Sequence, residues 1–363
     1  GYGDFEYDVP SGFYSICTKN LPEPTVDSAS HFNTVLYTGT GSSNEQNADG
    51  ITNGVDFLWT KCRSHVKQNI LVDIVRGATN NLMSDSPEVE NTNSNRSISL
   101  GNSSFTLNSN SGHLNENNKT YISWLWNAGN ANTAFSESGN NPGGIHRANQ
   151  AAGFSIVSYT GTGAAGTVAH GLGAAPEWIL IKNRDVNDEW YVYYGDNTDY
   201  LVLDDTDATA DSATAFNDTS PTATVFTVNT SHSVNADGEK YIAYCFRSIE
   251  GHSKLGQYEG NNNANGTFVN TGFRPSLVVV KDIDSTGEWR LQSSKMTTFN
   301  GDDVSVLTWN STAAEYTSDR DDLDLDFLSN GFKHRSTYSQ VNAARTYIYF
   351  AFAETPFKYS NAR

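Results

Sequence analysis

The chain has 363 residues and a formal net charge of −18, from 41 acidic and 23 basic side chains. A surface this acidic repels phosphate groups, which argues against a nucleic-acid partner and against binding to anionic membranes. Aromatic residues make up 12% of the chain, enough to fill hydrophobic cores. The abundant Asn, Ser, Thr, Asp and Gly favour short strands and turns over long helices.

The chain begins at Gly1 without a methionine, from which we expect a fragment or a processed chain. Its three cysteines, Cys17, Cys62 and Cys245, are too few for a disulfide framework. Cys62 and Cys245 lie in apolar, strand-like runs, which is typical of buried thiols in a protein that folds in a reducing cytoplasm. Neither a signal peptide nor a long apolar stretch is visible, so we expect no membrane insertion.

Three sequence landmarks recur in the same order along the chain: a strand that runs into a Gly-rich turn, an apolar strand that ends in lysine, and a tyrosine-led strand. The first reads NTVLYTGTG from Asn33, FSIVSYTGTG from Phe154 and, more weakly, KLGQYEGN from Lys254; the second ends at Lys61, Lys182 and Lys281; the third contains Tyr121, Tyr241 and Tyr347. These lysines lie 121 and 99 positions apart, and these tyrosines 120 and 106. Such spacing predicts three copies of one domain.

The landmarks set the expected organisation of the chain. Residues 1–30 are a lead-in and linker, residues 31–130, 154–253 and 254–358 are the three repeats, residues 131–153 are a linker, and residues 359–363 are a tail. A polar insertion that begins at Ser84 is expected to be a surface loop of the first repeat. The YTGTG pentapeptide ends a strand and leads into no helical pattern, so it predicts a turn rather than a phosphate-binding loop.

Within the second repeat, five strand candidates follow one another: WILIKN, WYVYYG, YLVLDD, VFTVNT and KYIAYCF. This spacing is typical of an all-β domain. WILI and YIAYCF are apolar on both faces, so we expect them at the centre of a sheet that is covered on each side. The fold class predicted is three tandem antiparallel β-sandwich repeats, jelly-roll or immunoglobulin-like, with a small barrel as the competing arrangement.

Acidic runs are the only candidates for a metal site, because no histidine has the spacing of a zinc ligand. One run contains Asp204, Asp205, Asp207, Asp211 and Asp218. The other, DRDDLDLDF, supplies the candidate calcium ligands Asp321, Asp322, Asp324 and Asp326. Neither run has the spacing of a calcium loop, and an edge strand with a charged outer face is the favoured interpretation of the second. We predict no catalytic residue and no cofactor other than a possible structural calcium ion.

Aromatic residues divide into two groups by their surroundings. Trp190 and Trp289 occupy equivalent places in two repeats, which favours a shared role in the core. Trp309 and Tyr316 lie in polar surroundings and are the candidates for exposed stacking against a receptor sugar.

The chain resembles appendage proteins of bacteriophages that infect marine bacteria. The lead-in GYGDFEYDVPSGFYSICTKNLP resembles the end of a SPRY-type module. AGFSIVSYTGTGAAGTVAHGLGAAPEWILIKNRD and GTFVNTGFRPSLVVVKDIDSTGEWRL resemble an uncharacterised repeat domain of the same tail-fibre-like proteins. The resemblance implies a virion protein that folds in the host cytoplasm, contacts other virion proteins, and assembles as a homo-oligomer such as a trimer.

The repeats and the resemblance together predict a non-enzymatic tail fibre or spike, an extended rod of β domains that binds a host cell-surface glycan or protein. The loops SDSPEVENTNSNRS (84–97) and NDTSPTAT (217–224) are the expected contact regions. A purely structural capsid-fibre, decoration or filament-forming subunit is the alternative. A polysaccharide depolymerase with paired carboxylates is a third, less favoured hypothesis.

Overall fold

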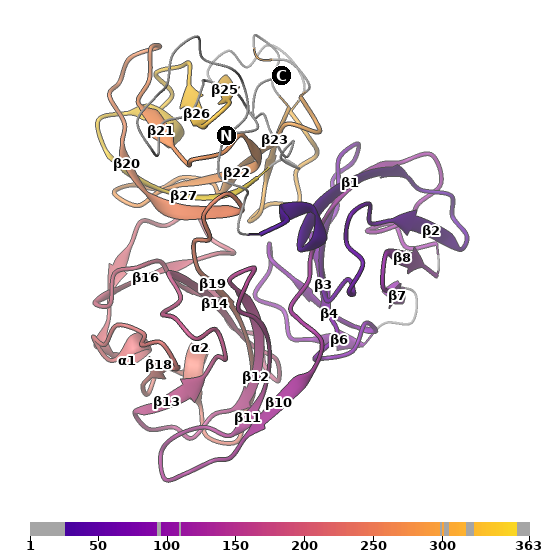
Figure 1. Cartoon of the computed structure of the whole chain (residues 1–363). Coiled ribbons are helices and arrows are strands. Elements are labelled where there is room, and N and C mark those ends of the chain that lie inside the picture. The colour runs from indigo at the N-terminus through magenta and orange to yellow at the C-terminus, as the bar shows by residue number, and fades with distance from the viewer. Residues whose placement is uncertain are drawn as a thin grey trace, which may run out of the picture.

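The computed structural model describes residues 26–92, 96–108, 110–297, 300, 305–316 and 323–353 (Figure 1). Strands dominate this part of the chain, and every pairing between them is antiparallel. The helices α1 (Ala213–Phe216), α2 (His232–Asn235) and α3 (Ser339–Asn342) span one turn each, as does the 3-10 helix η2 (Ser28–Ser30). The predicted all-β class is therefore confirmed.

The strands form three equivalent units, each with a large and a small sheet. In unit 1, the large sheet has the order β1 (Phe32–Thr38), β9 (Thr120–Trp126), β3 (Phe57–Cys62), β4 (Ile70–Asp73), β5 (Asn80–Met83) and β6 (Asn91–Thr92). Its small sheet has the order β2 (Asn44–Asn47), β8 (Ser104–Leu107) and β7 (Ile98–Leu100). The first strand of the unit thus pairs with the last, and the last pairs with the lysine-ending strand.

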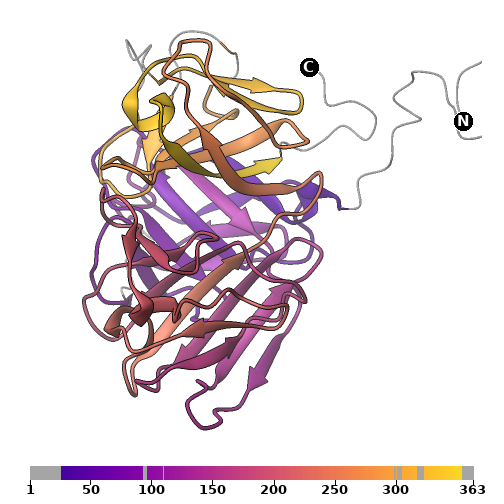
Figure 2. The ribbon, with the colours of Figure 1, turned by 90° about the vertical axis from the view of Figure 1, so that its left-hand side faces the viewer.

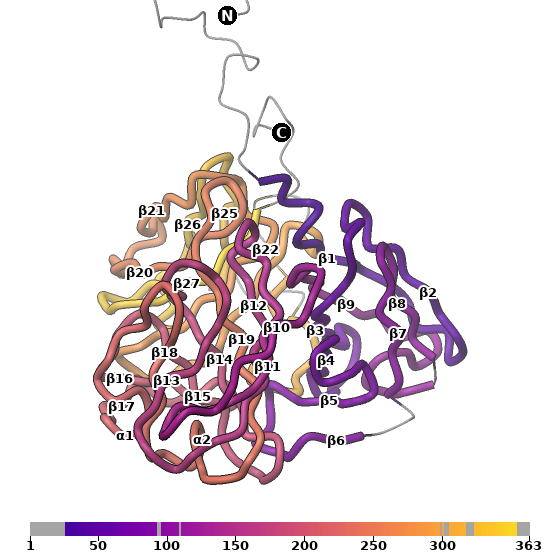
Figure 3. The backbone as a smooth tube through the Cα atoms, turned by 60° about the horizontal axis from the view of Figure 1, so that its bottom comes forward, coloured from indigo at the N-terminus to yellow at the C-terminus, as the bar shows by residue number. Residues whose placement is uncertain are grey.

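Unit 2 repeats this order. Its large sheet runs β10 (Asn132–Phe135), β11 (Gly144–Asn149), β12 (Phe154–Thr160), β19 (Lys240–Phe246), β14 (Trp178–Asn183), β15 (Tyr191–Tyr193), β16 (Asp199–Val202) and β17 (Ala210–Asp211). Its small sheet pairs β13 (Gly166–Ala169) with β18 (Val225–Val228). Residues 131–153, predicted as a linker, contain the hairpin β10–β11, which Figure 3 shows beside β12.

Unit 3 has the simplest large sheet, in the order β20 (Ser253–Glu259), β27 (Thr346–Ala353), β22 (Pro275–Asp282), β23 (Arg290–Ser293) and β24 (Val306–Thr308). Its small sheet has the order β21 (Phe268–Asn270), β26 (Gly331–His334) and β25 (Leu325–Leu328). Apart from the added hairpin β10–β11 in unit 2, all three large sheets have the order first, last, second and third strand, as the repeated landmarks require.

Both faces of the central strands of each large sheet are buried. One face packs on the small sheet of its own unit and forms three separate cores. The opposite faces meet in one central core that is built by all three units. In β14, Trp178 and Leu180 enter the central core while Ile179 and Ile181 enter the core of unit 2, as the two-residue period of a strand requires. The expectation that WILI and YIAYCF are covered on each side is confirmed.

The three units surround the central core instead of following one another along a rod (Figure 1). Unit 3 contacts unit 1 directly. Phe32 at the start of β1 packs on Phe352 near the end of β27, with ring centroids 4.5 Å apart. Figure 2 shows the indigo start of the described chain beside unit 3. The expected extended rod is therefore wrong for this chain: large apolar faces on both sides of each sheet are buried most completely when the units close on one another.

The repeated Gly-rich turn closes around a buried asparagine. In unit 2, the Asn235 side chain accepts a hydrogen bond from the Thr162 amide at 2.9 Å and donates to the Ala164 carbonyl at 2.7 Å. Asn115 and Asn342 hold the corresponding turns of units 1 and 3. The preceding tyrosines, Tyr37, Tyr159 and Tyr258, donate their hydroxyls to carbonyls one residue before each asparagine. The pentapeptide is a structural turn.

A glycine in this turn is required by the neighbouring backbone. A Cβ atom at Gly161 would overlap the carbonyl oxygen of Ala236. We expect Gly161→Ala to lower the free energy of unfolding by about 1–3 kcal/mol, because main chain must move to admit the methyl group. Gly195→Ala is the control, since only one atom lies within 4 Å of its Cβ position, at 3.9 Å, and its positive φ brings backbone strain alone. Urea unfolding of both variants measures the difference; equal losses would contradict the proposed overlap.

Candidate functional site

The repeated lysines lie at the seams, the boundaries where neighbouring units meet. Lys182 of unit 2 donates to the Pro87 carbonyl of unit 1 at 3.0 Å, and Lys281 of unit 3 donates to the Thr206 carbonyl of unit 2 at 2.8 Å. Lys61 of unit 1 donates to the Ser311 carbonyl of unit 3 at 2.7 Å. The three bonds run in one cyclic direction, so each lysine reaches back to the preceding unit and the ring closes.

Burial changes the acidity of these lysines. Removal from water disfavours the charged ammonium group and lowers the pKa of Lys61, Lys182 and Lys281 to about 8. Each group is still protonated at neutral pH and donates hydrogen bonds on both sides of the seam, as Lys281 does to the carbonyls of Thr206 and Gly287. The arrangement is that of a charged clamp between units, with its donors directed at backbone oxygens.

The same cyclic pattern appears next to each lysine. The indole of Trp190 donates to the Met83 carbonyl of unit 1 at 2.8 Å, and that of Trp289 to the Val202 carbonyl of unit 2 at 3.0 Å. At the corresponding place in unit 1, the Asn69 side chain donates to the Trp309 carbonyl at 2.7 Å. Trp190 and Trp289 are both buried in the central core, so their predicted core role is confirmed.

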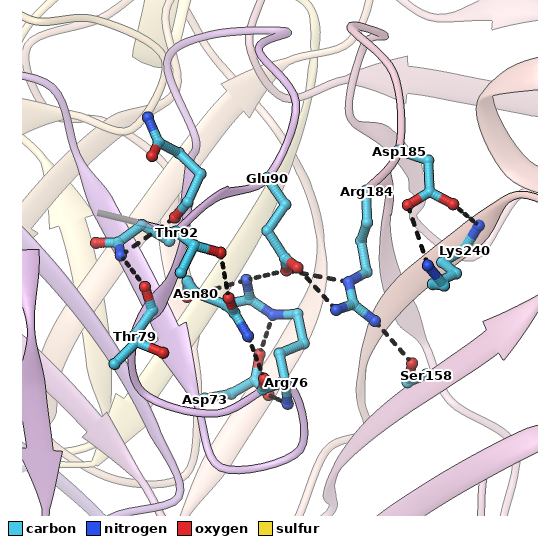
Figure 4. A network of polar contacts seen from close by, with 12 residues as sticks. Asp73, Arg76, Thr79, Asn80, Glu90, Thr92, Ser158, Arg184, Asp185 and Lys240 are labelled. Carbon is cyan, nitrogen blue, oxygen red and sulfur yellow. Dashed lines mark hydrogen bonds and ion pairs between the residues drawn. The ribbon is translucent and has the colours of Figure 1, made fainter. Parts of the chain in front are cut away.

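A network of buried charges joins units 1 and 2 (Figure 4). Arg76 pairs with Asp73 at 2.5 Å, and both side chains are fully buried. Arg76 also donates to Glu90 at 2.8 Å and to the hydroxyl of Tyr244 at 3.1 Å. Glu90 in turn accepts two hydrogen bonds from Arg184 of unit 2, at 3.0 and 2.8 Å. Every charge in this network has an opposite charge within reach, as buried ions require.

The predicted contact loop 84–97 supplies much of this seam. Ser84, Ser86 and the backbone of Pro87 are buried or bonded to another unit, and Glu90 reaches Arg184. The expectation of a surface loop is therefore wrong for Ser84 and Ser86, which are buried, while Pro87 and Glu88 are exposed; residues 93–95 lie outside the described chain. The polar composition misled the sequence interpretation, because these polar groups are satisfied by a unit that lies about a hundred residues further along the chain.

Trp309 is not available to a receptor. It is 1% exposed, and its ring stacks on Trp59 of unit 1 with centroids 4.1 Å apart. Tyr316 is half-buried, and the guanidinium of Arg290 lies 5.9 Å from its ring centre. The predicted exposed stacking is wrong for Trp309, since its polar sequence neighbours lie at the seam with unit 1 and leave the indole in the central core.

The candidate calcium ligands are only partly described. Asp321 and Asp322 lie outside the described chain. Asp324 is buried. The Asp326 carboxylate lies 3.4 Å from the Arg335 guanidinium and forms an ion pair with it. Within the described ranges, no group of three or more His, Cys, Asp or Glu side chains is placed to hold a metal ion. Structural calcium stays a prediction.

Two histidines, His252 and His334, are deeply buried and have few polar neighbours among the described residues. His252 bonds to the Ser28 hydroxyl through Nδ1 at 2.8 Å, while its Nε2 has no partner there. His334 is equally buried, and the Asp324 backbone is its hydrogen-bonding neighbour. Burial lowers the pKa of both imidazoles to about 3, because neither environment solvates the charged ring.

These histidines make the fold sensitive to acid. In the unfolded chain they bind protons below their ordinary pKa of 6.5, while in the folded chain they stay neutral down to about 3. Stability is therefore lost as the pH falls through this interval, by about 3 kcal/mol per histidine at a pH of about 4. We expect His334→Phe to remove one such loss. Urea unfolding at neutral and acidic pH measures it; a variant with the pH dependence of the unmodified chain would contradict the prediction.

The loop 217–224 differs from the loop at the first seam. All of its side chains except the half-buried Pro221 are exposed. The loop is nevertheless fixed: Asn197 donates to the Asp218 carbonyl at 2.6 Å, and Asn229 donates to the Asn217 side chain at 3.0 Å. An ordered polar loop with exposed side chains is the remaining predicted contact region that the structure leaves accessible.

In the described part of the chain, none of the helices has the length and apolar character needed to cross a membrane. Comparison with protein families matches residues 27–356 to one family, described as Domain of unknown function (DUF7483). The matched range covers all three units. Comparison with curated proteins gave no match.

Proposed function

The chain belongs to the DUF7483 family, and for this member we propose a non-enzymatic role as a virion appendage protein, tail-fibre-like or spike-like, that presents its β units to a host-surface glycan. The observation that supports this most directly is the closed ring of three units around one core. A fold of this kind is a rigid scaffold on which exposed loops keep fixed positions.

The distribution of charged groups also favours a scaffold. The buried Arg76, Asp73 and Lys182 are engaged at the seams, where they hold units together. Perturbed ionisable groups often mark active sites, but structural ion networks perturb pKa values as well. In this protein the lowered pKa values of the three lysines coincide with the seams, which supports the structural account.

The first experiment is electron microscopy of native particles labelled with an antibody against this chain. We expect the label at the tail tip, and we expect purified chain to compete with particles for adsorption to host cells. Label spread over the capsid or along detached filaments would overturn the receptor-binding proposal and favour the alternative, a purely structural subunit. Cleavage of host polysaccharide by the purified chain would favour a depolymerase.

The loop 217–224 provides a sharper test of the same proposal. Replacing Asp218, Thr219 and Ala223 by Gly or Ser is expected to weaken adsorption competition while thermal unfolding stays nearly unchanged, because these side chains are exposed. Ser220 and Thr222 are kept, because their side chains bond to Tyr193 and to the Val225 backbone. Val66→Ala, on an exposed side chain of unit 1, is the control. Full competition by the loop variant would remove this loop from the contact surface.

The oligomer expected from the resemblance stays a prediction. One chain already supplies three equivalent units, so a trimer of chains would contain nine. Sedimentation equilibrium of the purified chain measures the stoichiometry; a monomer would contradict the predicted homo-oligomer.

A further inference from the structure

Three glycines occupy equivalent places after the first strand of each small sheet. Gly50, Gly171 and Gly272 have φ values of 93°, 74° and 82°. Each is followed by an apolar residue in the core of its own unit: Ile51, Leu172 and Phe273. A left-handed backbone favours glycine, and the space where a Cβ atom would lie can be compared directly between the three units.

In units 1 and 2 this space is filled by the chain that leads into the unit. A Cβ atom at Gly50 would lie 2.8 Å from the Cβ of Ala29 in η2. At Gly171 it would overlap the imidazole of His146 in β11 and lie 2.9 Å from the Cβ of Ala148. Both filling segments precede the strand that pairs with the last strand of the unit, which is β1 in unit 1 and β12 in unit 2, and β11 also pairs with β12 along its length.

In unit 3 the corresponding space is open. No described atom lies within 4 Å of the Cβ position of Gly272. A cleft of about 290 Å³ is present there, lined by Ser248, Glu250, Ser253, Lys254, Asn270, Thr271 and Gly272. The connection from β19 to β20 consists of residues 247–252 alone, and is too short to supply a counterpart of the β10–β11 hairpin.

The strand beside the cleft, β20, is an edge strand of its described sheet. Ser253 at its start bonds to Ile249, and the Leu255 amide donates to the Ser248 hydroxyl, so an added strand would pair from Gln257 onward. β20 pairs along its length with β27, and with no other strand that the structure describes apart from an isolated bridge between Ile249 and Ser253. The equivalent strand β12 is paired on both sides, by β11 and β19. Lys254 and Glu250 form no ion pair with the described residues. An edge strand next to a cleft is a template for an added strand.

We propose that unit 3 binds an extended polypeptide segment of a partner protein, which adds as a strand along β20 and places a small or imidazole side chain over Gly272. A polypeptide is the occupant that the molecule itself indicates, because η2 and β11 fill the two equivalent sites. The acidic surface, with a net charge of −18, favours a basic segment electrostatically. β11, which reads GIHRAN, has this composition.

The probe is a synthetic peptide with the sequence of residues 143–150, GGIHRANQ, titrated into the purified full chain. Hydrogen exchange is expected to slow in β20 on binding. β1 is also an edge strand of its described sheet, but Ala29 fills the glycine site of unit 1, so no slowing is expected there. Gly272→Asn fills the cleft with the side chain that best tolerates positive φ, and should weaken peptide binding at least tenfold.

Gly238→Asn is the matched control, because Gly238 has a φ of 75° and its Cβ position is also open. Its affinity for the peptide should equal that of the unmodified chain. The proposal is overturned if the peptide shows no saturable binding up to about 1 mM, if Gly272→Asn binds as well as the control, or if protection falls on β1. It is also overturned if neutral oligosaccharides, rather than the peptide, protect β20. None of these outcomes depends on where the protein lies in a particle.

Discussion

Arg76→Met is expected to lower the free energy of unfolding by about 3–5 kcal/mol, because it leaves Asp73 buried without its cation. The pair is fully buried, and Arg76 also holds Glu90 and the Tyr244 hydroxyl at the seam between units 1 and 2. Chemical denaturation followed by tryptophan fluorescence measures the loss.

Lys240→Met provides the control for this prediction. Lys240 and Asp185 form an ion pair at 3.7 Å in which both side chains are well exposed, and solvent screens such a pair to less than about 1 kcal/mol. The double variant Asp73→Asn, Arg76→Met should be more stable than Arg76→Met alone, because it removes the uncompensated charge. If Arg76→Met costs no more than Lys240→Met, the buried network does not hold the seam.

Trp309→Ala has an effect of similar size for a different reason. The substitution removes an indole that stacks on Trp59 and meets Phe350 with ring centroids 5.5 Å apart. Truncation of a buried tryptophan costs about 3–5 kcal/mol through lost contacts and the cavity that remains. Asn69 donates to the backbone carbonyl of Trp309, and this hydrogen bond is available to alanine as well. The measured loss of unfolding free energy therefore comes from the indole side chain.

Val66→Ala is the matched exposed substitution, since Val66 is 66% exposed. It should change the free energy of unfolding by no more than about 0.5 kcal/mol. A Trp309→Ala variant as stable as Val66→Ala would restore the interpretation of Trp309 as a surface residue. Adsorption competition by a folded Trp309→Ala chain should be unchanged, because the indole contacts no solvent-facing surface.

The sequence predicted the features that each repeat carries locally. The lysine spacing located β3, β14 and β22, and the doubly apolar WILI run placed β14 at a sheet centre with both faces covered. The burial pattern of a strand depends on consecutive residues, so it can be predicted from a short stretch of sequence.

Features that depend on the meeting of distant segments were missed. Asn115, Asn235 and Asn342 looked like ordinary loop residues, although the repeated LN or VN before each tyrosine strand could have marked them. Trp309 was misassigned because the ring that buries it, Trp59, lies 250 positions earlier. Polar residues next to a side chain in sequence do not show whether another unit buries that side chain at a seam.

Ring closure also sets how this protein must be made. The seam between units 1 and 3 joins Lys61 to Ser311 and Arg63 to Glu315, pairs separated by some 250 positions, so it cannot form until most of unit 3 has left the ribosome. A chain that stops after two units exposes the central faces of both large sheets, with Trp59, Trp126 and Trp178 among them. Long-range closure of this kind slows folding and leaves intermediates prone to aggregate. During synthesis the central faces therefore stay exposed until β27 of unit 3 has formed. Deleting one unit would leave the shared central core of the other two open to solvent.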